Sequence, residues 1–92
     1  MARVRVEIPS VLAQVVEGRR SVEVEGATLS EAIAALVRLH PALGIHLFDE
    51  SGRFRQHVLC FHNRTSTRWM EHLDVPVADG DTITILQAVS GG

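Results

Sequence analysis

The segment from Thr28 to Pro41 has the spacing of a single amphipathic helix, and no other feature constrains the fold as strongly. Thr28 and Glu31 form a capping box, in which each side chain satisfies a backbone N–H group at the start of a helix. Pro41 prevents the helix from continuing. The apolar stripe consists of Leu29, Ile33, Leu36 and Val37, with Leu39 close to it. Such a stripe must be buried, so the rest of the chain has to supply an apolar surface that covers it.

The two segments before this helix alternate apolar and polar residues, which is typical of half-buried strands. They are "RVRVEIP" at 3–9 and "SVEVEG" at 21–26, and we predict that they pair as a hairpin with Gly18 in the connection. The apolar segment 11–16 between them fits either a short helical turn or a loop under the sheet. The residues predicted to face inward are Val4, Val6, Ile8, Val22 and Val24.

The segments after the helix predict a third strand and a long polar excursion. "ALGIHLFDESG" at 42–52 is predicted to be a short irregular helix followed by a turn. "QHVLCFHN" at 56–63 reads as a strand with apolar residues on both faces, and the polar excursion covers 64–77. "ADGD" at 78–81 is typical of a turn, because Asp-Gly tolerates the positive φ that tight turns require.

The last predicted strand is "TITILQAV" at 82–89, with Ile83 and Ile85 facing inward. The order strand, strand, helix, strand, excursion, strand predicts an α+β fold, a β-grasp (ubiquitin-like) mixed sheet with one main helix packed on one face. A right-handed crossover places the last strand beside the first, in the middle of the sheet. We therefore predict a single domain over 1–92, with a flexible Ser-Gly-Gly tail at 90–92 that leaves from a well-paired strand.

The composition argues against several classes of function. The 92 residues leave room for one core, and 46% hydrophobic with 22% charged residues is typical of a globular protein. The net charge is −2 and the pI about 6.2, so we expect no nucleic-acid partner and no membrane association. The apolar stretches are too short to span a bilayer, and the start of the sequence lacks a signal-peptide core. The single cysteine fits a reducing cytoplasm. In the absence of a partner, we expect the protein to be a monomer.

Several motifs resemble those of the ubiquitin-like sulfur carriers of the ThiS/MoaD type. This family includes the small subunit of molybdopterin synthase, the thiamine-pathway carrier and a carrier for cysteine biosynthesis. The chain length and Ile8-Pro9 resemble the cysteine-biosynthesis carrier most. Two departures, Gln87 in place of proline and Ser90 in place of alanine or glycine, bear on the choice of partner. The motifs are V-x-V-x-I-P at 4–9, G-x-T-L-x-E-A at 26–32, P-x-L at 41–43 and D-x-P-V-x-D-G-D-x-I-x-I-L-x-A-V-x-G-G at 74–92.

The resemblance implies a non-catalytic carrier whose terminal carboxylate is the reagent. An adenylating and sulfurtransferase enzyme of the ubiquitin-activating type would use ATP to form an acyl-adenylate on Gly92. A persulfide sulfur would then replace AMP, and the resulting thiocarboxylate would serve a cysteine synthase, a thiazole synthase or the large subunit of molybdopterin synthase. No cofactor is expected on the carrier itself. Gly91 and Gly92 lack a Cβ and can thread a narrow channel, and Ser90 is small enough to follow them.

A partner must also recognise the folded body, and the last two strands offer a candidate surface. If Val58 and Cys60 point inward, then Leu59 and Phe61 join Leu86 as an exposed apolar patch near the tail, and such patches commonly mark interfaces. In the opposite phase Leu59 and Phe61 are core residues. The two readings stay open, because a shift of one residue exchanges the faces of a strand.

The remaining candidate residues are given structural interpretations. A lone cysteine in an apolar strand indicates packing rather than a sulfur relay, and "DGD" lacks the further acidic ligands of a calcium loop. Trp69 is interpreted as a packed residue in preference to a partner anchor, and Arg64 and Arg68 as solvating their loop. The histidines lack metal-ligand spacing with a second cysteine or carboxylate and are expected at the surface, namely His40, His46, His57, His62 and His72.

Two other functions compete with the sulfur carrier. One is a ubiquitin-like modifier that forms amide bonds to lysines of target proteins; because the chain has no lysine, it has no side chain on which to build chains of itself. The other is a plain binding module whose glycine tail has no chemical role.

Overall fold

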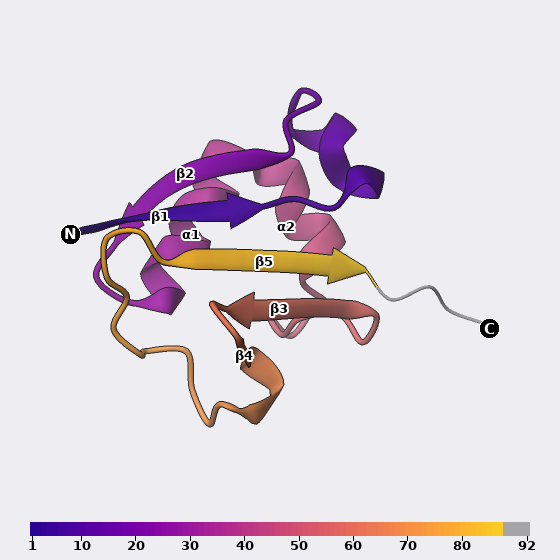
Figure 1. Ribbon diagram of the computed structural model, residues 1–92. Helices are drawn as coiled ribbons and strands as arrows, with labels where there is room; N and C mark the ends of the chain where they lie inside the picture. The colour runs from indigo at the N-terminus through magenta and orange to yellow at the C-terminus, as the bar shows by residue number, and fades with distance from the viewer. Residues whose placement is uncertain (88–92) are drawn as a thin grey trace.

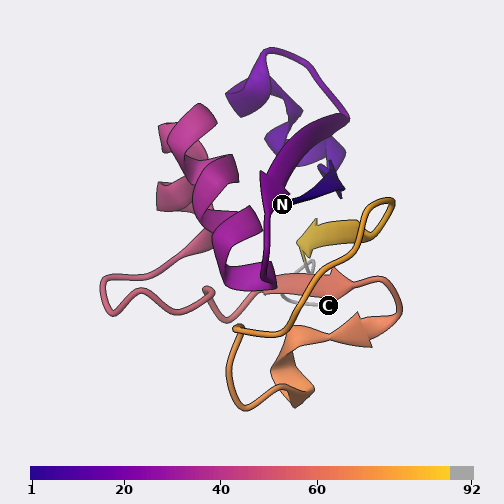
Figure 2. The same cartoon turned by 90° about the vertical axis from the view of Figure 1, so that its left-hand side faces the viewer.

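The structure is a computed structural model that describes residues 1–87. A five-stranded mixed sheet in the order β2-β1-β5-β3-β4 carries the two α-helices on one face (Figures 1 and 2). This architecture confirms the predicted α+β, β-grasp fold. The elements are β1 (Ala2–Glu7), the 3₁₀ helix η1 (Ser10–Val16), β2 (Ser21–Gly26), α1 (Leu29–Leu39), α2 (Pro41–Leu47), β3 (Val58–His62), β4 (Thr65–Ser66), the 3₁₀ helix η2 (Thr67–Trp69) and β5 (Thr82–Gln87).

The hairpin predicted from the alternating segments is confirmed. β1 and β2 pair antiparallel from Ala2↔Gly26 to Glu7↔Ser21. Their connection is the helical turn η1, whose apolar side chains close one end of the core, so the loop alternative is wrong. The chain then reverses at Glu17 and Gly18, which have φ angles of 60° and 80°. A left-handed conformation is easiest for glycine, which accounts for Gly18 in this connection.

Helix α1 begins at the predicted capping box. The Oγ1 atom of Thr28 accepts a hydrogen bond from the N–H group of Glu31 at 3.1 Å. The carboxylate of Glu31 accepts from the N–H group of Ala27 at 2.9 Å, one residue before the cap, so the reciprocal half of the box is displaced. Just upstream, Gly26 approaches the helix so closely that a Cβ there would lie 2.7 Å from the backbone nitrogen of Ala32. Gly26, the glycine of the G-x-T-L-x-E-A motif, is therefore required because α1 packs too closely to leave room for a Cβ.

The apolar stripe of α1 faces the sheet, with one exception. Leu29, Ile33 and Leu36 are buried, and Val37 is half-buried against Gly44 of α2. Leu39, which the sequence places close to the stripe, is 59% exposed and is not part of the buried face. It lies about 80° around the helix from Leu29, at the edge of the covered arc, and it is the last residue of α1.

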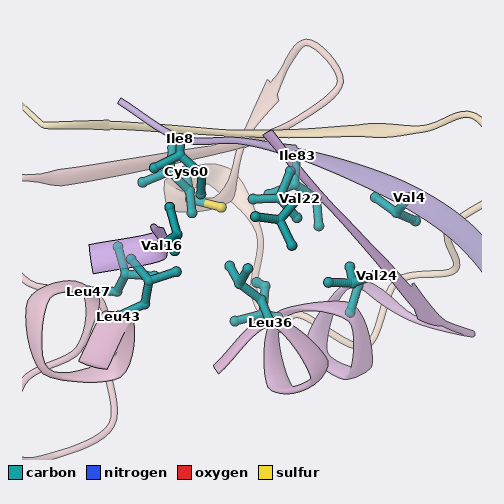
Figure 3. Packing of buried hydrophobic residues seen from close by; sticks show 14 of the residues in the cluster. Val4, Ile8, Val16, Val22, Val24, Leu36, Leu43, Leu47, Cys60 and Ile83 are labelled. Carbon is teal, nitrogen blue, oxygen red and sulfur yellow. The ribbon is translucent and has the colours of Figure 1, made fainter. Parts of the chain in front are cut away.

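β5 lies in the middle of the sheet, as the crossover rule predicts. It pairs parallel with β1 from Arg5↔Thr82 to Glu7↔Thr84, and antiparallel with β3 from His62↔Ile83 to Val58↔Gln87. Figure 3 shows the resulting core, with side chains of the sheet above and side chains of the helices below. The labelled residues are Val4, Ile8, Val16, Val22, Val24, Leu36, Leu43, Leu47, Cys60 and Ile83.

The polar excursion 64–77 is tied to the start of α1. The carbonyl of Val75 accepts from the N–H group of Leu29, and the carbonyl of Leu73 accepts from the N–H group of Ser30, both at 2.9 Å. The first turn of a helix has N–H groups without partners inside the helix, and here the excursion satisfies two of them. This contact holds the long connection on the body of the protein. Within residues 1–87, no helix is both long enough and apolar enough to cross a membrane.

Candidate functional site

The strand that leads to the predicted tail is held firmly up to its last described residue. At its start, β5 is flanked by β1 and β3, and from Ile85 onward β3 alone accompanies it, ending in the pair Val58↔Gln87. The residues predicted to carry the chemistry, Ser90, Gly91 and Gly92, lie outside the described residues. Their roles remain predictions.

The phase of β3 is decided by burial. Val58 and Cys60 are each 2% exposed and point into the core, so Leu59 and Phe61 lie on the opposite, outer face. Leu59 stands directly across from Leu86 in the β3–β5 register, and directly opposed residues have Cβ atoms roughly 5 Å apart. Leu86 is 43% exposed. Leu59 and Phe61 are half-buried, so they are less exposed than the prediction of an exposed patch implied. These three residues form what we call the outer patch.

Charged residues border the outer patch on the other half of the sheet. The outward residues of β1 and β2 oppose each other with opposite charges, as in Arg3↔Glu25 and Arg5↔Glu23. The Nε atom of Arg3 also lies 3.7 Å from a carboxylate oxygen of Glu23. Glu7 continues this row beside Thr84 of β5. An apolar centre with a charged margin is the usual composition of a protein–protein interface.

At the other end of β5, hydrogen bonds hold the start of the strand. The Nε2 atom of His62 lies 2.8 Å from an Oδ2 atom of Asp81, and that oxygen also accepts from the N–H group of Ala78 at 2.9 Å. The Ala78 N–H group first, and then His62, lower the pKa of the Asp81 carboxyl. Asn63 adds two hydrogen bonds to the backbone of Thr82, at 2.7 and 2.9 Å. This arrangement fixes the start of β5 against β3 and the turn that precedes it.

The "DGD" segment is a turn, as predicted. Gly80 has a φ of 89°, and the N–H group of Asp81 donates to the carbonyl of Ala78 at 3.0 Å. The carboxylate of Asp79 accepts from the N–H group of Arg3 at 2.7 Å, which links the turn to β1. Both carboxylates of the motif therefore bind backbone groups of the protein itself.

Cys60 has a packing role, which confirms the interpretation from sequence. Its side chain is 2% exposed in the core, and burial raises the pKa of its thiol to about 12. Nucleophilic sulfur chemistry requires a thiolate, and such a pKa keeps the thiol protonated at neutral pH. The fold therefore supplies no reactive thiol of its own within residues 1–87.

Three interpretations from sequence are wrong. Trp69 is not packed: it is 84% exposed at the end of η2. His62 is not a surface residue, because its side chain is only 16% exposed and is paired with Asp81. His57 precedes β3 and is exposed, so it does not share a strand with His62. The errors at Trp69 and His62 concern contacts between segments distant in sequence, for which local patterns give no signal.

Comparison with known proteins places these features in a family context. The ThiS family model matches residues 6–92. The chain is 35% identical over 91 residues to the sulfur carrier protein CysO of Mycobacterium tuberculosis, covering 97% of this chain and 98% of that protein. It is also 35% identical over 80 residues to small archaeal modifier protein 1 of Haloferax volcanii, covering 84% of this chain and 87% of that protein. A chain in the crystal structure of the Amycolatopsis orientalis BexX/CysO complex superposes with a TM-score of 0.84 at 36% identity, covering 97% of this chain and 99% of that chain.

Proposed function

The chain belongs to the ThiS family, and we propose that it is a sulfur carrier whose terminal glycine, Gly92, is adenylated and converted to a thiocarboxylate. The observation that carries this proposal is the 35% identity to the sulfur carrier protein CysO across 97% of the chain. The sequence Ser90-Gly91-Gly92 supplies a tail of the required chemistry. As a carrier, the protein acts as a co-substrate and leaves catalysis to its partner enzymes.

The proposed reaction begins with activation, because a carboxylate is a poor acyl donor. An adenylating enzyme of the ubiquitin-activating type would join the Gly92 carboxylate to the α-phosphate of ATP and release pyrophosphate. A persulfide sulfur would then attack the acyl carbon and expel AMP, and a thiol would cleave the remaining S–S bond to leave the thiocarboxylate. ATP is bound by the partner, and the carrier needs no cofactor. Because Gly91 and Gly92 have no Cβ, the acyl carbon stays accessible in a narrow active site.

The outer patch is proposed as the surface that the adenylating enzyme recognises. Leu86 lies on the strand that leads to the tail, and Leu59 stands directly across from it. The six residues that follow Leu86, 87–92, reach at most roughly 20–22 Å when extended. A partner seated on the patch therefore has the terminal carboxylate within reach of an adjacent catalytic site.

We favour a sulfur-accepting synthase for cysteine as the recipient, since the chain is 35% identical to the sulfur carrier protein CysO over 97% of its length. Synthases for molybdopterin or thiazole remain the alternatives within the same chemistry. We expect the reaction to take place in the cytoplasm. A second class of function, amide conjugation to lysines of target proteins, is favoured by the similarity to small archaeal modifier protein 1.

Intact mass spectrometry tests the proposal and separates the two classes. The purified protein is incubated with ATP, a persulfide source and an adenylating enzyme of the ubiquitin-activating type. A mass increase equal to the exchange of one oxygen for one sulfur supports the carrier. Conjugates to lysines of other proteins, without that exchange, support the modifier. A sulfur carrier that the same enzyme is known to load serves as the positive control. If that carrier is loaded and neither product forms from this protein, the proposed tail chemistry is wrong.

A further inference from the structure

The small net charge of the protein conceals a strongly uneven distribution. Residues 51–70 contain four arginines and no aspartate or glutamate, a formal charge of +4. The rest of the chain holds the other five arginines and all eleven carboxylates, a formal charge of −6, and the two parts together give the net charge of −2. The basic segment includes β3 and β4, which form the lower edge of the sheet in Figure 1. Charge gathered on one edge points to a partner of opposite sign.

A groove of about 710 Å³ lies at this edge, between the loop that follows α2 and the segment around η2. Phe48 and Phe54 stack in its wall with ring centroids 4.7 Å apart. The apolar residues that line the groove are Phe48, Phe54, Val58, Met70 and Leu73. Three arginines, Arg53, Arg55 and Arg68, line it as well, against one carboxylate, that of Glu71. The groove thus combines an apolar surface with an excess of positive charge.

Two of these arginines are held in place by neutral groups. The Nε atom of Arg55 donates to the carbonyl of Ile45 at 2.9 Å, and an Nη2 atom of Arg68 donates to the carbonyl of Gln56 at 2.7 Å. Within residues 1–87, no carboxylate oxygen lies within 4.0 Å of the charged nitrogens of any arginine in 51–70. Asp49 is nearby, but its oxygen accepts from the N–H groups of Ser51 and Arg53. The guanidinium groups of Arg55 and Arg68 are therefore oriented by neutral acceptors, and Asp49 acts on the charge of Arg53 without a direct ion pair. The excess of positive charge favours binding of an external anion.

Trp69 is an exposed aromatic residue next to the groove in sequence, although its side chain is not part of the lining. It lies between Arg68 and Met70, which both line the groove, and it is 84% exposed. Tryptophan and arginine are the residues most enriched among those that dominate the energy of protein interfaces.

We propose that this groove binds an acidic segment of a partner protein, which inserts an aromatic or aliphatic side chain among the phenylalanines and pairs its carboxylates with Arg53, Arg55 and Arg68. No residue of the outer patch lines the groove, and Val58 in its wall lies on the opposite face of β3 from Leu59. A segment bound in the groove therefore does not have to contact the outer patch. The interaction does not depend on the chemistry of the tail.

The test uses the purified ¹⁵N-labelled protein and a synthetic peptide of aspartates and glutamates around one central phenylalanine, without ATP or any enzyme. We expect amide shifts to concentrate in residues 48–58 and 67–73 and the affinity to fall with added salt. Arg53→Glu should weaken binding roughly tenfold, because an attraction becomes a repulsion. Trp69→Ala should weaken it measurably with unchanged thermal stability, since the side chain is exposed.

The matched control is Arg38→Glu, which changes the net charge equally but lies beside β2, at the opposite edge of the sheet. It should alter the affinity by no more than about twofold, because distant charges are screened. Equal weakening by Arg53→Glu and Arg38→Glu would show a general charge effect and overturn the proposal. So would equal binding of a peptide with asparagine and glutamine in place of the acids, absence of binding at millimolar peptide, or tighter binding of a single-stranded oligonucleotide by the same residues.

Discussion

Replacing Leu36 by alanine tests whether the apolar stripe of α1 carries the stability of the fold. Leu36 is fully buried among the side chains that face it from the sheet. Removing a buried leucine side chain costs about 3–4 kcal/mol, from lost burial and from the cavity that remains. A domain of this size has a free energy of unfolding of about 5–15 kcal/mol. The variant should therefore stay folded at low temperature and melt roughly 15 °C or more below the parent protein.

Leu39→Ala is the matched control, since it makes the same chemical change in the same helix at a position that is 59% exposed. It should change the free energy of unfolding by no more than about 0.5 kcal/mol. Circular dichroism during thermal and urea unfolding measures both variants. Leu36→Asp, which buries an unpaired charge, should prevent folding. Equal destabilisation by Leu36→Ala and Leu39→Ala would show that the helix does not pack as the structure describes.

Four further predictions concern the tail, the outer patch, the buried thiol and the acid stability. Deleting Gly92 should abolish sulfur loading in the mass assay, because it withdraws the carboxylate by one residue, roughly 3.3–3.6 Å. The melting temperature should stay unchanged, and loading at the normal rate would refute the carrier function. Leu86→Glu should slow loading at least about tenfold, whereas Leu39→Glu, an exposed site of α1, should not, and equal rates would remove the outer patch from the interface. Cys60, with a thiol pKa of about 12, should resist alkylation at pH 8 until the protein is unfolded, and Cys60→Ser should still be loaded; rapid modification of the native protein would contradict its burial. The pKa of Asp81 is lower in the folded than in the unfolded chain. Its stabilising contribution is therefore present above the unfolded pKa and is lost as the pH falls through the folded value. Asp81→Asn should reduce the loss of unfolding free energy at acid pH, and an identical loss in both proteins would show that Asp81 does not contribute.

Much of the fold could be predicted because its signals are local. The alternation of Val4 and Val6 with charged neighbours follows from the two-residue repeat of a strand, and the cap at Thr28 follows from the need of a helix start for acceptors. The central position of β5 follows from the handedness of the crossover between parallel strands. The alternatives for 11–16 stayed open, because a short apolar run has no period long enough to distinguish a turn from a loop.

The sequence alone thus determined four of the five strands, the main helix, their order and the family resemblance on which the carrier function rests; β4, at Thr65–Ser66, lies in the segment predicted to be a polar excursion. Tertiary structure decided which face of β3 is buried, since "VLCF" is apolar on both sides and only its register with β5 places Leu59 across from Leu86. It also decided the exposure of Trp69 and the pairing of His62 with Asp81. These features depend on segments that meet only when the chain is folded, and no spacing along the chain encodes such contacts.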